Sequence, residues 1–276
     1  MKCGQVGVIF GTKDRSQEER KYLKWVFAYL LLLSERRGPH ATGIAYLKQD
    51  GEHGIFKRPL PASEYVKDKA FIRTLVKATG GTTWLAGHTR WPTQGSHLDN
   101  HNNQPILVGG RLIGTHNGHL TNADELFERL DLPRFAEVDS EVIFRMADAA
   151  LSDGRIDLAA FKKHLALCRG MMSAVLASKL DPKRVIVIKG NKPLELRYHP
   201  EHRAIAYASD PAYLDVALPP ETGWAEIPTR AMSLMTFDCD DLPDFASQPF
   251  RLAGGRGRAG FQRFTGWQIQ PDEQDQ

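Results

Sequence analysis

The stretch Gly87-His88-Thr89-Arg90-Trp91-Pro92-Thr93-Gln94-Gly95 decides how the rest of the chain is interpreted. It follows residues 83–86, a short apolar run that is typical of a buried strand. We therefore expect the stretch to lie at a strand end, where a sheet holds side chains in fixed positions. Its cation, hydroxyl and amide groups would suit a turn that binds a small zwitterion.

The composition is that of an ordinary globular protein. The chain has 276 residues, 42% of them hydrophobic and 25% charged, which is enough to bury a sizeable core. The formal net charge of +3 is small for this length. Charge alone therefore does not indicate nucleic acid or an anionic membrane as a partner.

Cysteine usage and the N-terminal sequence predict a cytoplasmic location. The three cysteines Cys3, Cys168 and Cys239 are widely spaced, which favours reduced thiols over a disulfide framework. The longest apolar run, residues 25–33, is too short to cross a bilayer and predicts a buried helix. The segment that begins at Met1 lacks the apolar core of a secretory signal, so we expect no membrane partner.

Apolar periodicity and turn residues predict a protein rich in strands, with helices between them. The expected strands are 5–10, 41–47, 54–57, 83–86, 104–108, 111–115, 173–178, 184–189, 194–199, 204–208 and 231–237. The expected helices are 20–36, 62–77, 121–130, 139–151 and 156–168. The pattern fades after Asp238, so we expect a domain over residues 1–238 and a Gly/Arg-containing C-terminal tail over residues 239–276.

Cys3 is the strongest candidate for a catalytic residue. A thiol is intrinsically nucleophilic, and a cysteine at a chain start can use its own α-amine, which titrates at about pH 8, as the base. The alternative is that Cys3 is simply a small buried hydrophobe.

Other residues have the chemistry to hold a zwitterionic substrate. Arg90 could bind a carboxylate and Asp139 an ammonium group, although the alternatives are a surface ion pair for Arg90 and a helix N-cap for Asp139. Asn117-Gly118 could form a simple turn, or an oxyanion hole from a side-chain amide and a backbone N–H. The ten histidines do not form a His-Glu-x-x-His pattern, and we expect no metal site and no cofactor.

Five blocks of sequence, taken in order, resemble one known family. They are Cys3-Gly4-x-x-Gly7-Val8, Arg37-Gly38-Pro39-x-x-x-Gly43-Ile44-Ala45, Gly87 to Gly95 as quoted above, His116-Asn117-Gly118 and Asp139-Ser140-Glu141. Together they are similar to the class II glutamine amidotransferase domain, the N-terminal-nucleophile (Ntn) hydrolase module of amidophosphoribosyltransferase and glucosamine-6-phosphate synthase. The resemblance runs from Cys3 to about Phe237 and implies an α+β fold, a four-layer αββα sandwich of two antiparallel sheets.

The resemblance also implies an activity and a role for each residue. Cys3 would attack the side-chain amide of L-glutamine, form a glutamyl thioester and release ammonia, and water would then free glutamate. Arg90 would bind the substrate carboxylate and Asp139 its ammonium group, while Asn117 and Gly118 would stabilise the oxyanion. Trp91, Thr93 and Gln94 would line the pocket. The chain departs from many members at His40, where they have Asp.

Two functions from different classes follow from this resemblance. The first is a stand-alone glutaminase subunit that passes ammonia to a separate acceptor enzyme. Its activity depends on exposure of Cys3, either by removal of Met1-Lys2 or by a start of the chain at Cys3; otherwise the thiol must act without its own amine as the base. The alternative is a catalytically silent binding or scaffold protein with the same fold that keeps Met1-Lys2. A nucleic-acid binder acting through the arginines of the tail has less support, because acidic residues follow them and aromatic residues are sparse.

Overall fold

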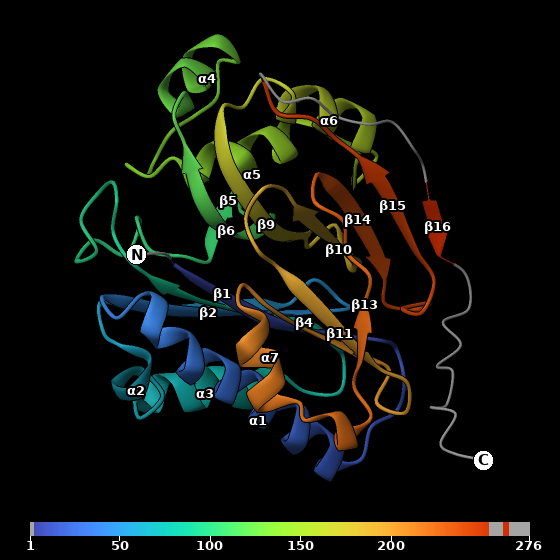
Figure 1. Ribbon diagram of the computed structural model, residues 1–276. Helices are drawn as coiled ribbons and strands as arrows, with labels where there is room; N and C mark the ends of the chain where they lie inside the picture. Colours follow the sequence, from blue (N-terminus) through green and yellow to red (C-terminus); the bar gives the residue numbers. More distant parts are fainter. Residues whose placement is uncertain (1–2, 254–261, 265–276) are drawn as a thin grey trace.

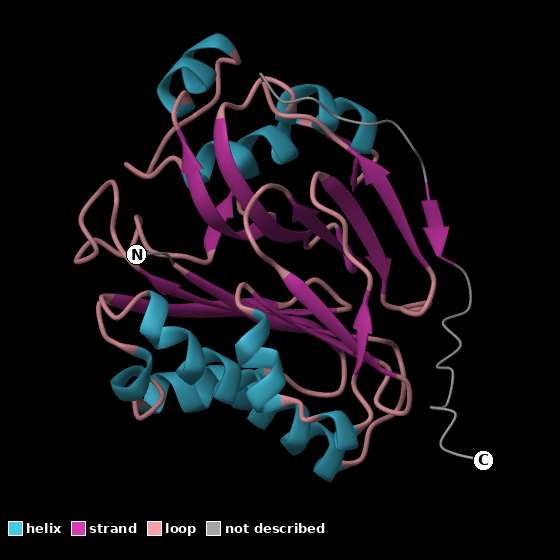
Figure 2. Cartoon of the chain, in the orientation of Figure 1, coloured by secondary structure: helices cyan, strands magenta, loops and turns pink. Residues whose placement is uncertain are grey.

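Two seven-stranded sheets face each other at the centre of the molecule, and helices cover the outer face of each (Figures 1 and 2). A computed structural model of the chain describes residues 3–253 and 262–264, with the side chains of 262–264 left out. All the strand pairings in the two sheets are antiparallel. The expected four-layer αββα sandwich is confirmed.

The first sheet contains the N-terminal strand at its centre. In spatial order its strands are β13 (Ala225–Ile227), β11 (Glu195–His199), β12 (Ala204–Ala208), β1 (Gly4–Phe10), β4 (Thr82–Arg90), β2 (Ala41–Lys48) and β3 (His53–Arg58). The pairing of β1 with β4 places Gly4 opposite Thr89. A Cβ atom on Gly4 would lie 2.4 Å from Oγ1 of Thr89, so this close approach requires glycine directly after Cys3.

The second sheet is built mostly from the C-terminal half of the chain. In spatial order its strands are β16 (Gln262–Phe264), β15 (Phe245–Pro249), β14 (Ser233–Asp238), β10 (Asp181–Lys189), β9 (Gly170–Ser178), β6 (Leu112–Leu120) and β5 (Ile106–Val108). A separate two-stranded ribbon is formed by β7 (Leu151–Ser152) and β8 (Arg155–Ile156).

Apolar side chains fill the three spaces between the four layers. Trp84, Val187 and Phe237 are among the buried residues of the cluster between the sheets. One outer cluster packs the first sheet against its helices, which are α1 (Gln17–Ser34), α2 (Ala62–Tyr65), α3 (Lys69–Lys77) and α7 (Pro211–Ala217). The other packs the second sheet against α4 (Ala123–Arg129), α5 (Ser140–Ala149) and α6 (Leu158–Leu165). Short 3₁₀ turns are present at η1 (Glu35–Arg37) and η2 (Pro220–Thr222).

Helix boundaries differ from those expected where capping residues decide them. Helix α1 begins at Gln17 rather than near Arg20, because Ser16 and Glu19 form a capping box that satisfies backbone N–H groups at its start. The single helix expected over residues 62–77 is two helices, since the Asp68 side chain accepts the N–H of Ala70 and caps a new start.

The folded region extends past Asp238, where we expected the tail to begin. Strand β15 pairs with β14 over its full length, and Cys239, Leu242 and Phe250 are buried in the core. Strand β15 has only five residues, which are too few for apolar periodicity alone to distinguish a strand from a loop. The Gly/Arg run at 254–258, which belongs to the predicted tail, lies outside the described residues.

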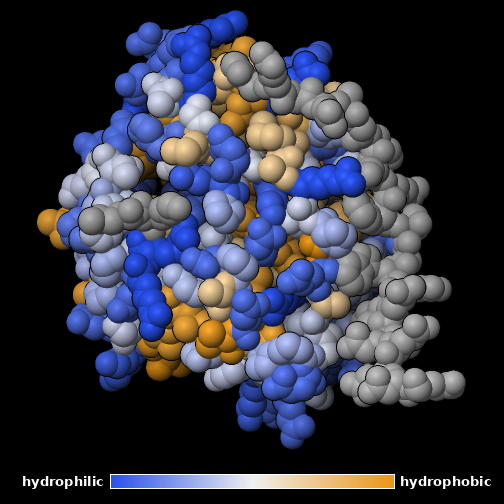
Figure 3. Space-filling view, viewed as in Figure 1, coloured by the Kyte–Doolittle hydropathy of each residue, from blue (hydrophilic) through white to orange (hydrophobic). Residues whose placement is uncertain are grey.

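The surface in Figure 3 is mostly hydrophilic, with apolar side chains gathered over α1 and α7 in its lower half. The apolar run 25–33 forms part of α1 and buries Val26, Phe27, Leu30 and Leu31, as expected, while Trp25 stays 53% exposed. No helix in the described part of the chain has the length and apolar character needed to span a bilayer.

Candidate active site

Cys3 is the first described residue and directly precedes β1. Its Sγ atom lies 3.4 Å from both the backbone O and the backbone N of Trp91, donating to one and accepting from the other. Burial raises the pKa of the Cys3 thiol, an effect opposed by the Trp91 hydrogen bond and by the charge of Arg90 and reinforced by the charge of Asp139. The structure therefore brings the predicted nucleophile together with three predicted substrate-binding residues.

Arg90 ends β4 and is buried, with only 4% of its surface exposed. Its Nη2 donates to the carbonyl oxygens of Gln94 at 2.5 Å and Gly95 at 2.9 Å. Its Nη1 donates to Asn103 Oδ1 at 2.8 Å and to the carbonyl oxygen of Ser96 at 3.2 Å. The guanidinium thus holds the following loop in place, and both of its Nη groups are engaged by protein acceptors.

Asn117 and Gly118 lie within β6, rather than after a strand as we expected. The Asn117 side chain is buried, yet its Nδ2 has no hydrogen-bond partner among the described residues. A Cβ atom on Gly118 would lie 2.0 Å from the carbonyl oxygen of Met171 on β9, so only glycine fits there. A buried, unpaired amide donor is costly to a fold, and an acceptor on a bound ligand would satisfy it.

Asp139 occupies the N-cap position of α5, but its side chain does not cap that helix. Its Oδ2 instead accepts the backbone N–H of Leu120 at 2.6 Å and lies 3.4 Å from Nδ1 of His119. The capping alternative for Asp139 is therefore wrong for its side chain. In the described residues no hydrogen bond to its Oδ1 is present, so this oxygen of a mostly buried side chain is available to a cation.

The remaining predicted pocket residues follow Arg90 in the loop. The Trp91 ring packs edge-on against His40, with ring centroids 4.6 Å apart, and His40 also contacts His97. Thr93 is exposed, and the contact of Gln94 with Arg90 is made by its backbone. At the position where many family members have Asp, His40 therefore supports Trp91 by ring packing.

Two buried hydrogen bonds tie the three strands of the site to one another across the sheets. Gln5 Nε2 on β1 donates to the carbonyl oxygen of Thr115 on β6 at 2.9 Å, and His88 Nε2 on β4 lies 3.2 Å from the carbonyl oxygen of His116. Asn117 and Gly118 therefore sit on β6 between Thr115, which is tied to β1, and Leu120, which is tied to Asp139.

Several residues that support the site had no assigned role in the sequence analysis. Arg37 Nε donates to the carbonyl oxygen of Cys3 at 2.8 Å, and its Nη1 pairs with Asp210 at 3.2 Å. Gln104 accepts the N–H of His116 at 2.5 Å and donates to Ser140 Oγ at 3.1 Å. The Arg37-Gly38 block of the sequence could have identified Arg37, whereas no local sequence pattern marks Gln104.

Within residues 3–253, no cluster of His, Cys, Asp and Glu is arranged to hold a metal ion.

Comparison with known proteins agrees with this geometry. Residues 88–216 match the family model described as a glutamine amidotransferase domain. Glutamine–fructose-6-phosphate aminotransferase (isomerizing) of Geobacillus kaustophilus is 29% identical over 70% of this chain and 30% of its own length. The corresponding protein of Halalkalibacterium halodurans is 31% identical over the same shares. The solved structure of glutamine phosphoribosylpyrophosphate amidotransferase from B. subtilis has the same fold, with a TM-score of 0.65 and 21% identity over 90% of this chain and 49% of its own.

The chain carries a class II glutamine amidotransferase domain. The family match spans Arg90, Asn117, Gly118 and Asp139 of this amidotransferase domain, and Cys3 precedes it. The chain spans about a third of the length of the first curated relatives it matches, and about half of the solved structure. What the individual residues of the domain do in a reaction stays a prediction.

Proposed function

We propose that this chain hydrolyses the side-chain amide of L-glutamine to glutamate and ammonia, with Cys3 as the nucleophile. The observation that carries the proposal is the buried, unpaired Nδ2 of Asn117. It lies on the strand that is joined to β1 through Thr115 and to Asp139 through Leu120. An unpaired donor held in place before the reaction is what an oxyanion requires.

Substrate binding requires one group for each charge of the amino acid. Asp139 Oδ1 accepts no hydrogen bond from the described residues and would bind the α-ammonium group. Arg90 would bind the α-carboxylate through its Nε–H, or by giving up one of the loop carbonyls that its Nη groups hold. Trp91, Thr93 and Gln94 would then line the pocket, because Arg90 holds the loop that carries them.

The reaction follows from these positions. Cys3 Sγ attacks the amide carbon as the thiol proton passes to the α-amine of Cys3, and Asn117 Nδ2 and the Gly118 N–H stabilise the oxyanion. Collapse breaks the C–N bond, the leaving nitrogen takes that proton, and ammonia departs from a glutamyl thioester. Water then attacks the thioester, giving its proton back to the sulfur and releasing glutamate.

The raised pKa of the Cys3 thiol means that the reaction requires a base to accept the thiol proton. Because burial raises the pKa of this thiol, little thiolate exists at neutral pH without a proton acceptor. An α-amine on Cys3 can serve only when Cys3 is the first residue of the chain. We therefore propose that activity appears once Met1-Lys2, which lie outside the described residues, are removed.

The ammonia requires an acceptor outside the described sandwich. We propose that a separate enzyme receives it, docked closely enough to prevent the loss of ammonia to water. Support comes from the relatives, because the chain matches only 30% of the length of proteins named as aminotransferases. Location in the cytoplasm is part of the same proposal.

A second candidate function is favoured by one observation. Both Nη groups of Arg90 are already occupied by protein acceptors, as they would be in a domain that no longer binds a substrate carboxylate. Such a chain would keep Met1-Lys2 and act as a binding or scaffold protein.

Intact mass and a glutaminase assay on the same purified protein separate the two functions. The proposed function predicts a chain lighter by Met and Lys, glutamate release, and loss of that release in Cys3→Ala. Cys168→Ala is the matched control, since Cys168 is buried in the outer core of the second sheet. A full-length mass together with no glutamate release would favour the scaffold, and release that survives Cys3→Ala would exclude Cys3 as nucleophile.

A further inference from the structure

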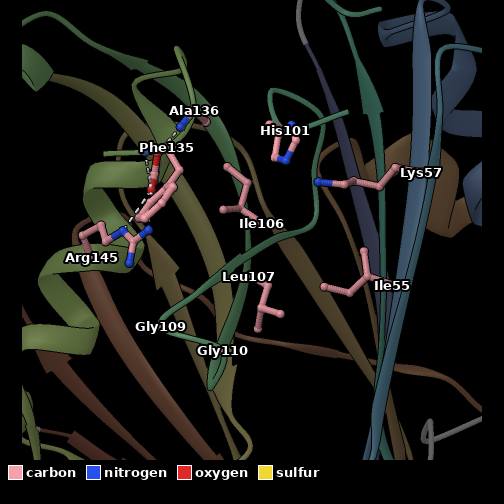
Figure 4. Close-up of a pocket in the computed structure, with 11 residues that line it drawn as sticks. Ile55, Lys57, His101, Ile106, Leu107, Gly109, Gly110, Phe135, Ala136 and Arg145 are labelled. Atoms are coloured by element: carbon pink, nitrogen blue, oxygen red, sulfur yellow. Dashed lines mark hydrogen bonds and ion pairs between the residues drawn. The ribbon is translucent and has the colours of Figure 1, made fainter. Parts of the chain in front are cut away.

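A cavity of about 460 Å³ opens at the edge of the sandwich, between β3 of the first sheet and β5 of the second. Its lining includes Ile55 and Lys57 from β3 and Ile106 and Leu107 from β5, with Phe135 closing it from the loop before α5 (Figure 4). None of the predicted glutamine-site residues lines it. A volume of this size is within the range of about 300–1,000 Å³ that small organic ligands occupy in proteins.

Lys57 places a positive charge in this cavity. Figure 4 shows its side chain reaching from β3 toward His101 and Ile106. Its Nζ donates to the carbonyl oxygen of Asn103 at 2.8 Å, and it forms no ion pair within the described ranges. Burial lowers the pKa of Lys57 to about 8, so the ammonium form still predominates at neutral pH.

The other charged groups of the lining are already paired. Arg145 Nη2 lies 2.8 Å from Glu141 Oε1, with both side chains almost fully buried. His101 Nδ1 lies 2.9 Å from Asp99 at the exposed rim. The wall therefore combines apolar side chains with one cation, Lys57, that is in no ion pair with the described residues, and the only hydrogen bond of its Nζ among them is to Asn103.

The buried residue Asn103 connects the cavity to the candidate active site. Asn103 accepts Lys57 Nζ at its backbone oxygen, and its Oδ1 accepts Arg90 Nη1 at 2.8 Å. Its Nδ2 donates to the carbonyl oxygen of His97 at 2.7 Å, within the loop that follows Arg90. A ligand that draws Lys57 away from Asn103 would therefore shift the residue that accepts a hydrogen bond from Arg90.

We propose that this cavity is a second ligand site, which takes a small organic anion with an apolar body, and that its occupant changes glutamine binding through Lys57, Asn103 and Arg90. The apolar body packs between β3 and β5, and the anionic group accepts the free N–H groups of Lys57. The coupling rests on the proposed function, whereas the ligand site itself does not.

Fluorescence titration of the full chain with 8-anilinonaphthalene-1-sulfonate tests the site, because this probe joins an aromatic body to a sulfonate. We expect saturable binding that weakens by about tenfold or more in Lys57→Met, since a charge-assisted hydrogen bond is lost. Lys163→Met is the matched control, because Lys163 is exposed on α6, outside the cavity. Equal affinity in Lys57→Met and Lys163→Met would overturn the proposal.

A second variant keeps the test decisive if Lys57→Met does not fold. Leu107 is 38% exposed on an edge strand, where a larger side chain is tolerated, so Leu107→Trp fills the cavity mouth and should abolish binding of the probe. Unchanged binding in a folded Leu107→Trp would place the probe elsewhere and overturn the proposal. Circular dichroism and the thermal midpoint establish that each variant is folded.

Glutamine affinity tests the coupling. With saturating probe, the KM for glutamine should change by about fivefold or more in the unmodified sequence and stay constant in Lys57→Met. The Kd for glutamine, measured by calorimetry, gives the same test without turnover. If probe binding follows the expected pattern but no glutamate is released, the proposed function fails and the ligand site stands. If the probe saturates and neither KM nor Kd changes, the coupling is wrong.

Discussion

The carboxylate of Asp139 accepts the backbone N–H of Leu120 at 2.6 Å and leaves the start of its own helix uncapped. An aspartate at a helix N-cap position normally stabilises the first turn. Here the side chain instead joins α5 to the end of β6, next to the predicted oxyanion hole. We predict that this carboxylate, held in place by the Leu120 N–H, also binds the ammonium group of the substrate.

Two substitutions of Asp139 separate its structural bond from its predicted role in binding. Asp139→Asn keeps an acceptor for the Leu120 N–H but removes the charge, so we expect the KM for glutamine to rise about 10- to 100-fold with little change in stability. Asp139→Ala also leaves that buried N–H unpaired, which should lower the free energy of unfolding by about 1–3 kcal/mol. Steady-state kinetics and urea unfolding check both. An unchanged KM in Asp139→Asn would rule out the ammonium-binding role.

Asn117→Ala should affect turnover far more than stability. Its Nδ2 has no partner to lose, so the free energy of unfolding should hardly change, whereas kcat should fall about 10²- to 10³-fold if the amide stabilises an oxyanion. Asn122→Ala is the matched control, because Asn122 donates to the carbonyl oxygen of Leu167 and accepts the N–H of Arg169. The control should lose about 1–3 kcal/mol of stability and keep its kcat. The reverse pattern would mean that Asn117 has a structural role only.

The alkylation rate of Cys3 should report its raised pKa. Only the thiolate reacts with iodoacetamide, so labelling followed by peptide mass should increase with pH with a midpoint above the ordinary value of 9.0. Asp139→Asn removes a charge that raises this pKa, so its midpoint should move to lower pH. Cys168, whose pKa is raised to about 12 by burial, is an internal reference that should label more slowly. A midpoint below 9.0 in the unmodified sequence would contradict the assigned environment.

The buried histidine His88 should make the fold sensitive to acid. Its pKa is lowered to about 3, mainly by burial, so it stays neutral in the native state while the unfolded chain takes up a proton below about pH 6.5. The native state then binds fewer protons than the unfolded state, and stability falls as the pH drops from about 6.5 to about 3. The expected slope is about 1.4 kcal/mol per pH unit for this residue.

Urea unfolding at several pH values checks this loss of stability. His88→Gln retains an amide donor for the carbonyl oxygen of His116 and removes the titrating ring, so its stability should depend less steeply on pH in the acid range. Identical slopes for His88→Gln and the unmodified sequence would show that other groups dominate the acid response.

Local patterns in the sequence determined most of the strands, the family and the set of candidate residues. Short apolar runs and turn residues predicted β1, β2, β9, β10 and β12 because each depends on neighbours within a few positions. The same local information, in the capping box of Ser16 and Glu19, was sufficient for the start of α1, although the apolar pattern alone placed it later. Five ordered blocks then pointed to the amidotransferase domain.

Only the tertiary structure decided what each candidate side chain contacts. Cys3 meets Trp91 across 88 positions of sequence, and Gln5 meets Thr115 across 110, so no local pattern predicts either contact. The same is true of Asp139, which turns to Leu120, and of Asn103, which joins Lys57 to Arg90. When the two sheets pack, they bury polar side chains away from water, and these side chains then form hydrogen bonds with whichever groups lie beside them. The sequence by itself therefore determined which residues have the chemistry, and the packing of the two sheets decided which of them are free to act.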